Sequence, residues 1–143
     1  MKFAETTEIE PLANESQNAV SLPFGLLGFE KNKRYALLAD PQEAPFLWLR
    51  MLEDPKAAFL TVNPFLVFPE YRPDLSDEDA AFLDLRSPEE AVVLNVVTLR
   101  TGGAATINLK GPIVINRRTL VGKQCIPVNA SAYNVQHPLP VAS

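Results

Sequence analysis

The 143-residue chain has little of the material from which catalytic and metal sites are usually built. It contains one cysteine, Cys125, and one histidine, His137. One cysteine excludes an internal disulfide, and these two residues alone cannot provide the ligand spacing of a zinc site. Cys125 lies in an apolar run, which indicates a buried, inert thiol. A lone histidine in the tail is usually exposed or packed, so we expect no catalytic role for His137.

Phosphate-binding glycine loops and long apolar runs are also missing. Neither G-x-x-x-x-G-K-[ST] nor G-x-G-x-x-G occurs. No apolar run approaches the ~20 residues of a membrane helix, and no secretory leader opens the chain. The carboxylates between 74 and 90 fall at helix-capping positions, where solvation explains them better than acid catalysis does. We therefore expect no enzyme activity, no cofactor, no metal, no membrane segment and a cytoplasmic location.

The acidic residues that are present are unevenly distributed. The net charge is only −4, but residues 70–90 carry eight acidic and two basic residues, and no Asp or Glu follows Glu90. Such a segment attracts basic partners and repels nucleic acid. The alternative is a solvated connector that is polar for solubility, and charge taken alone favours this alternative.

Short apolar runs separated by proline and glycine predict many short strands joined by stiff connections. Ser76 is a natural N-cap, and the acidic residues after it predict a short helix. We predict an all-β fold: a compact antiparallel β-barrel-like single domain over residues 1–143, with one or two short helices and loose ends at 1–5 and 138–143. The strands are expected at 35–39, 46–52, 58–62, 92–99, 106–116 and 124–128, with a further edge strand at 6–10, turns at 13–18 and 54–55, and a hairpin connection at 102–103.

The most informative string is Asn108–Asn116, followed by Gly122-Lys123-Gln124. Apolar side chains recur at period two from 107 to 115, which indicates one buried face. Gly111-Pro112 interrupts this strand, and since proline cannot donate to a ladder we expect an edge or a bulge there. Asn108 and Asn116 bracket the interruption and are suited to hydrogen-bond the disturbed backbone.

Together with three other segments, this string resembles the flagellar assembly factor FliW family. Residues 22–30, LPFGLLGFE, resemble its opening F-x-x-G-[IL]-x-G-F, and residues 68–71, FPEY, resemble its F-P-x-Y segment. Residues 131–139 resemble its C-terminal S-x-Y … H-P-L, although Gln136 stands where a basic residue is expected. Order and spacing fit from about Val20 to Leu139. The resemblance implies a compact antiparallel β-barrel-like domain.

The resemblance also implies a function. It implies a cytoplasmic factor that binds flagellin and the translational repressor CsrA in competition. Secretion of flagellin would free the factor to capture CsrA, which would release flagellin mRNA for translation. The alternatives are a dedicated flagellin chaperone without CsrA regulation and a small nucleic-acid-binding β-barrel. The aromatic residues are not interleaved with Arg or Lys, so we expect no direct nucleic-acid binding.

Two sets of candidate partner-binding residues lie in the acidic segment. CsrA is a basic RNA-binding dimer, so an acidic surface complements it. Phe68 and Tyr71 are a second candidate contact, because an aromatic ring beside acids and prolines can project outward as an anchor. Equally, Phe68 can be core and Tyr71 can pack with its hydroxyl satisfied. The charge facing CsrA is assigned to Glu70, Asp74, Asp77, Glu78 and Asp79.

Overall fold

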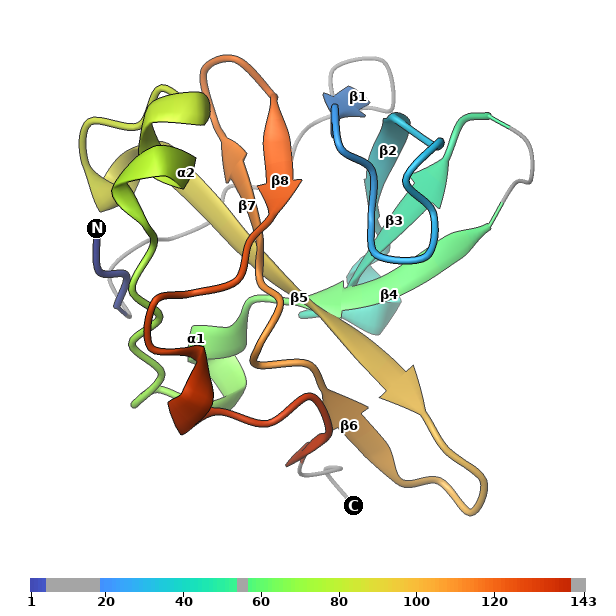
Figure 1. The fold of residues 1–143 in the computed structure, drawn as a ribbon. Coiled ribbons are helices and arrows are strands. Elements are labelled where there is room, and N and C mark those ends of the chain that lie inside the picture. Colours follow the sequence, from blue (N-terminus) through green and yellow to red (C-terminus); the bar gives the residue numbers. More distant parts are fainter. Residues whose placement is uncertain (5–18, 54–56, 140–143) are drawn as a thin grey trace.

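A computed structural model of the chain describes residues 1–4, 19–53 and 57–139, and its main feature is one antiparallel sheet (Figure 1). The strand expected at 6–10 and the turns expected at 13–18 and 54–55 lie outside these residues. The first four strands form a meander in which each pairs with the next. They are β1 (Ala19–Ser21), β2 (Arg34–Ala39), β3 (Leu47–Met51) and β4 (Ala58–Val62).

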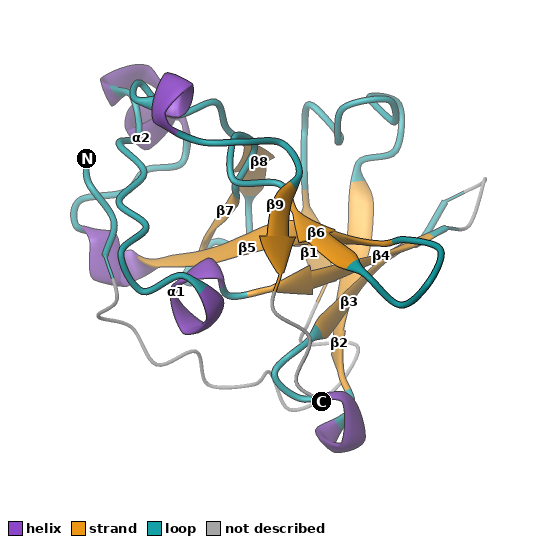
Figure 2. Ribbon diagram, turned by 90° about the horizontal axis from the view of Figure 1, so that it is seen from below, coloured by secondary structure: helices purple, strands orange, loops and turns teal. Residues whose placement is uncertain are grey.

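The long strand β5 (Ala91–Leu99) joins the meander to the rest of the sheet. β4 pairs with its middle, while β6 (Ala105–Ile107) pairs with its C-terminal end and β7 (Ile113–Asn116) with its N-terminal end. β9 (His137–Leu139) extends the sheet beyond β6, as Figure 2 shows, and β8 (Gly122–Gln124) extends it beyond β7. The described part of the chain is therefore all-β and antiparallel, as predicted.

Two short α-helices and three 3-10 turns complete the described elements. In α1 (Pro64–Val67), Asn63 accepts a hydrogen bond from Phe65 N at 3.0 Å. In α2 (Asp77–Phe82), Ser76 Oγ accepts from Asp79 N at 3.1 Å, which confirms the predicted N-cap. The 3-10 turns cover Pro41–Glu43, Pro88–Glu90 and Ala130–Ala132.

β5 separates two apolar cores. One face of β5, with Val93 and Val97, lies in the core that also contains Tyr71 and the residues around the helices. Leu94 points to the other face, into the core formed with β1, β2 and β3. Side chains alternate across a strand, so a strand with apolar residues on both faces can serve two cores at once.

The break at Gly111-Pro112 is confirmed, but the single buried face expected over 107–115 is wrong. Ile107 pairs with Val97 and Ile113 pairs with Leu94, so six residues of one chain segment span three of the other. Val97 and Leu94 are three positions apart on β5, which is an odd number, so their side chains point to opposite faces of the sheet. The residues paired with them, Ile107 and Ile113, therefore point to opposite faces as well. Ile107 therefore lies in the core of Tyr71, and Ile113 lies in the core of the meander.

The barrel expected from the sequence is not closed. β1 and β8 approach each other only at an isolated parallel bridge between Ser21 and Val121, where Ser21 N donates to the carbonyl of Leu120 at 2.9 Å. "Barrel-like" is therefore correct only in a loose sense.

The structure describes residues 1–4 and 138–139 of the two segments where loose ends are expected, and residues of both segments contact the core. Phe3 is buried and donates its backbone N–H to Pro73 O at 3.0 Å. Pro138 and Leu139 belong to β9, and Leu139 is buried. Apolar side chains at both ends find places in the same core, which composition alone does not reveal.

Candidate functional site

Residues 68–75, called the inner part below, follow α1, overlap the start of the acidic segment and are fixed to the core. Tyr71 is fully buried, and its hydroxyl donates to the carbonyl of Leu109 at 2.6 Å. Its ring packs against Tyr133 with 4.7 Å between centroids, and burial raises its pKa. Phe68 is half-buried, with its ring edge-on to His137 at 4.9 Å. Both aromatic side chains therefore pack against other residues of the chain. Their role in partner binding stays a prediction.

Two of the five candidate carboxylates have partners within the chain. Asp74 accepts from the amino group of Met1 at 3.3 Å, and its backbone bonds to Val128 and Asn129. Asp79 is buried and accepts a hydrogen bond from Lys123 Nζ, which forms an ion pair. This hydrogen bond raises the pKa of Lys123. Both carboxylates therefore have much of their charge compensated within the chain.

The other three candidate carboxylates are exposed. Glu70 lies in the turn before Tyr71, and Asp77 and Glu78 lie in the first turn of α2. Negative side chains are favourable at a helix N-terminus because they complement its dipole. The structure thus brings Asp77 and Glu78 together on one exposed turn and leaves Glu70 in a separate loop.

Sequence reasoning missed an exposed pair of aromatic side chains, Phe24 and Phe82, beside this turn. Phe24 is 56% exposed and Phe82 is 41% exposed, and their ring centroids are 5.0 Å apart. Figure 1 shows α2 on one side of the β7–β8 hairpin and the loop after β1 on the other. Lys123, on β8, places its Nζ 5.3 Å from the Phe24 centroid.

The sequence carried a signal for Phe82. At 100° per residue, Ala80 and Leu83 fall on one side of α2, and both are buried. Phe82 falls outside that stripe, so it could be recognised as an apolar residue on the exposed side. Phe24 has no comparable signal, because its position depends on the loop that follows it.

That loop, residues 24–28, is held in a tight conformation. Gly25 has φ +67°, and a Cβ there would lie 2.4 Å from the Phe29 carbonyl oxygen, so no larger residue fits. Leu27 N donates to Gln124 Oε1 at 2.9 Å, while the Leu27 side chain is 84% exposed. The loop therefore presents an apolar side chain from a fixed backbone.

The motif residues of the chain meet in one polar network. Asn108 Oδ1 accepts from Lys110 N at 3.0 Å and from Gly111 N at 3.1 Å, which confirms the local role expected for it. Gln124 Nε2 donates to Gly111 O at 3.2 Å and so connects the break in the strand to the loop 24–28. The buried Asn95 of β5 donates to the carbonyl of Asn108 at 2.7 Å. These motifs thus have a structural purpose.

Asn116 and Cys125 also have the structural roles expected for them. Asn116 Oδ1 accepts from Arg118 N at 2.8 Å and from Thr119 N at 3.2 Å, and its amide donates to the Leu83 carbonyl at 2.8 Å. Cys125 is fully buried, and burial raises the pKa of its thiol. A neutral, enclosed thiol is unreactive.

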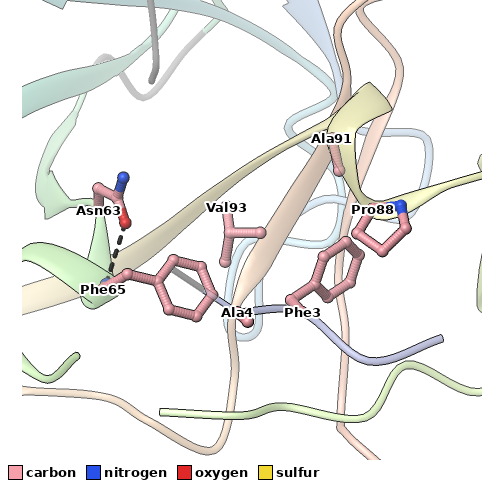
Figure 3. A pocket seen from close by; sticks show the side chains of 7 residues that line it. All are labelled: Phe3, Ala4, Asn63, Phe65, Pro88, Ala91 and Val93. Atoms are coloured by element: carbon pink, nitrogen blue, oxygen red, sulfur yellow. Dashed lines mark hydrogen bonds between the residues drawn. The ribbon is translucent and has the colours of Figure 1, made fainter. Parts of the chain in front are cut away.

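A small apolar hollow lies elsewhere, between the N-terminal segment and β5 (Figure 3). Its walls include the rings of Phe3 and Phe65 and the side chain of Val93. None of its lining residues carries a titratable side chain, so it offers no acid–base chemistry. Within the described ranges, we find no cluster of three or more His, Cys, Asp or Glu suited to a metal, and no helix both long and apolar enough to span a membrane.

Comparison with known proteins gives consistent results over nearly the whole chain. Residues 3–139 match the family described as "FliW protein". A flagellar assembly factor FliW of Clostridium botulinum is 40% identical over 126 residues, covering 87% of this chain and 89% of that protein. One from Natranaerobius thermophilus is 38% identical over 122 residues, covering 84% and 80%. A crystal structure of the flagellar assembly factor FliW covers 100% of both chains at 29% identity, with a TM-score of 0.79.

Proposed function

The chain belongs to the FliW family of flagellar assembly factors, and from this premise we propose that it is a cytoplasmic regulator that binds two proteins in exchange, flagellin and CsrA. While flagellin is abundant in the cell, it occupies the factor. Once flagellin is secreted, the free factor captures CsrA and so relieves repression of flagellin mRNA. This function requires binding surfaces and no catalytic group.

The observation that carries the CsrA half of the proposal is the exposed acidic turn of α2. Asp77 and Glu78 are exposed, and Glu70 adds a third exposed carboxylate in the same segment. Opposite charge on two partners steers their encounter and suppresses wrong partners. A basic RNA-binding repressor matches an acidic surface, whereas the phosphates of RNA itself are repelled by it. This favours protein binding over the nucleic-acid alternative.

The flagellin half of the proposal is supported by exposed apolar side chains. The ends of flagellin are helical and apolar, and an amphipathic helix binds where apolar side chains remain uncovered. Candidates among the described residues are Leu66, Leu99, Ile126, Val128 and Val135, each at least half exposed. A dedicated flagellin chaperone would have such a surface as well, so only CsrA binding separates the two functions.

The first test is calorimetric titration of the purified protein with CsrA from the same organism, with and without saturating flagellin. We expect tight CsrA binding that flagellin abolishes. Flagellin binding without any CsrA binding would leave the chaperone function and contradict the regulator. Binding of single-stranded RNA that falls steeply with salt would instead indicate the nucleic-acid-binding barrel.

The acidic surface is tested by neutralising its charge. The double variant Asp77→Asn, Glu78→Gln should slow CsrA association and flatten its dependence on salt concentration, because the steering charge is gone. Asp79 is left intact, since its loss would release Lys123. The matched control is Glu43→Gln, Glu89→Gln, which removes the same charge from exposed residues outside α2. Equal effects of the two double variants would reject a localised acidic site.

A further inference from the structure

The exposed aromatic residues Phe24 and Phe82 lie next to the acidic turn, and the functions assigned so far do not use them. They come from two elements 58 positions apart in sequence and still touch, with 5.0 Å between ring centroids. Two large apolar side chains that remain 56% and 41% exposed cost free energy in water. Aromatic residues of this kind are typical of the few positions that dominate a protein interface.

The pair is fixed before any partner arrives. Gly25 forces the chain into a tight turn directly after Phe24, and the Leu27 backbone behind it is bonded to Gln124. Phe82 is the last residue of α2, a helix held by its Ser76 cap. Aromatic side chains on a backbone held in this way need less ordering when a partner binds.

The charge around the pair selects the chemistry of its partner. Lys123 Nζ lies 5.3 Å from the centroid of the Phe24 ring, and this cation is already engaged by the buried carboxylate of Asp79. Asp77 and Glu78, one turn before Phe82 on the same helix, have exposed carboxylates. In the loop, the side chains of Glu30 and Lys31 carry opposite charges. α2 itself therefore carries exposed acidic charge beside the ring of Phe82 and has no basic residue.

We propose that Phe24 and Phe82 are the apolar anchor of the CsrA-facing surface, and that they receive an aliphatic side chain which lysine or arginine residues flank in the basic partner. This inference rests on the proposed function and adds a division of labour to it. The carboxylates of α2 set how fast the partner arrives, and the two rings set how long it stays.

The test measures association and dissociation rates of CsrA and of flagellin, separately, on immobilised protein. Phe24→Ala and Phe82→Ala should each raise the CsrA dissociation rate about tenfold or more and leave its association rate within about twofold. Flagellin binding should not change. The control for CsrA is Leu99→Ala, which truncates a 68% exposed leucine at the far end of β5 and should leave both CsrA rates unchanged.

The outcomes separate this inference from the proposed function. Unchanged CsrA dissociation in both variants overturns the anchor and leaves the regulator intact. Faster dissociation of flagellin, alone or together with CsrA, assigns the rings to an apolar helix and also overturns the anchor. Wild-type protein that binds no CsrA overturns both proposals. Thermal unfolding of each variant checks the fold, and Phe24→Ala keeps the test decisive if Phe82→Ala unwinds α2.

Discussion

The inner part, residues 68–75, and the helix α2 that follows it both contain acidic and aromatic residues, but these residues differ in how far they are engaged within the chain. In the inner part, the ring of Tyr71 and the carboxylate of Asp74 both find partners inside the chain. In α2, Asp77 and Glu78 remain exposed, and Phe82 is only partly covered. A run of acidic and aromatic residues therefore does not reveal which of its members are available to a partner.

Truncation of one aromatic side chain in each of the two regions should give the largest difference in stability between them. Tyr71→Ala should lower the free energy of unfolding by about 3–5 kcal/mol, because it opens a cavity and leaves the Leu109 carbonyl unpaired. Phe82→Ala should cost about 1 kcal/mol or less, since the ring is partly exposed. Urea denaturation measures both. Equal losses would show that Phe82 is as much a core residue as Tyr71.

The two kinds of carboxylate within α2 give the next largest difference. Asp79→Asn should lower the free energy of unfolding by about 1.5–3 kcal/mol, because it removes a hydrogen bond between charged groups. Asp77→Asn should change it by about 0.5 kcal/mol, as is usual at exposed positions. Lys123→Met in the Asp79→Asn background is the control, and it should add little further loss if the two residues act as one pair.

The stability of the protein at alkaline pH tests how completely Tyr71 and Cys125 are buried. Burial raises the pKa of Cys125 from 9.0 and that of Tyr71 from 10.0. A raised pKa in the folded state means that the unfolded chain loses the proton first, so stability is complete below these values and falls as pH rises above them. Each group should contribute a slope of at most about 1.4 kcal/mol per pH unit. Urea midpoints from pH 8 to 11 measure it, and Cys125→Ala should remove the decline between 9 and 10.

Loss of the cap of α2 should have a smaller effect than loss of the Asp79–Lys123 pair. Ser76→Ala should lower the free energy of unfolding by about 1 kcal/mol, because Asp79 N loses its acceptor. Ser76→Asp should restore most of that loss, since aspartate also caps well. Circular dichroism and urea denaturation follow the change. An alanine variant as stable as wild type would mean that Lys123 and Asp79, and not the cap, hold the helix.

The sequence was sufficient where local chemistry decides the structure. Ser76 and the acids after it predicted α2, Gly102-Gly103 predicted the turn between β5 and β6, and Asn108 predicted its own backbone contacts. The sequence left alternatives open where distant residues decide the structure. The burial of Tyr71 depends on Leu109 and Tyr133, and the pairing of Asp79 depends on Lys123, 44 positions away. A local sequence pattern does not contain information about partners that are distant in sequence.

The candidate site divides in the same way. Its exposed carboxylates, Asp77 and Glu78, could be predicted because a helix start with acids in its first turn faces water. Phe24 could not, since only the fold brings the loop after β1 to α2. The resemblance of the motifs identified the family, but the motif residues themselves are engaged in the network around Asn108 and Gln124.

The excursion at Asn108–Pro112, where six residues span three of β5, has a consequence for tolerance to length changes. In an ordinary hairpin, the turn dictates the register of everything that follows it. Here the extra residues uncouple the register of β7 on β5 from the register of β6 on β5. The register of β7 is then set by its own side chains, which pack into the two cores. Insertions or deletions in the β5–β6 hairpin can therefore accumulate among relatives without turning Ile113 and Ile115 out of their core.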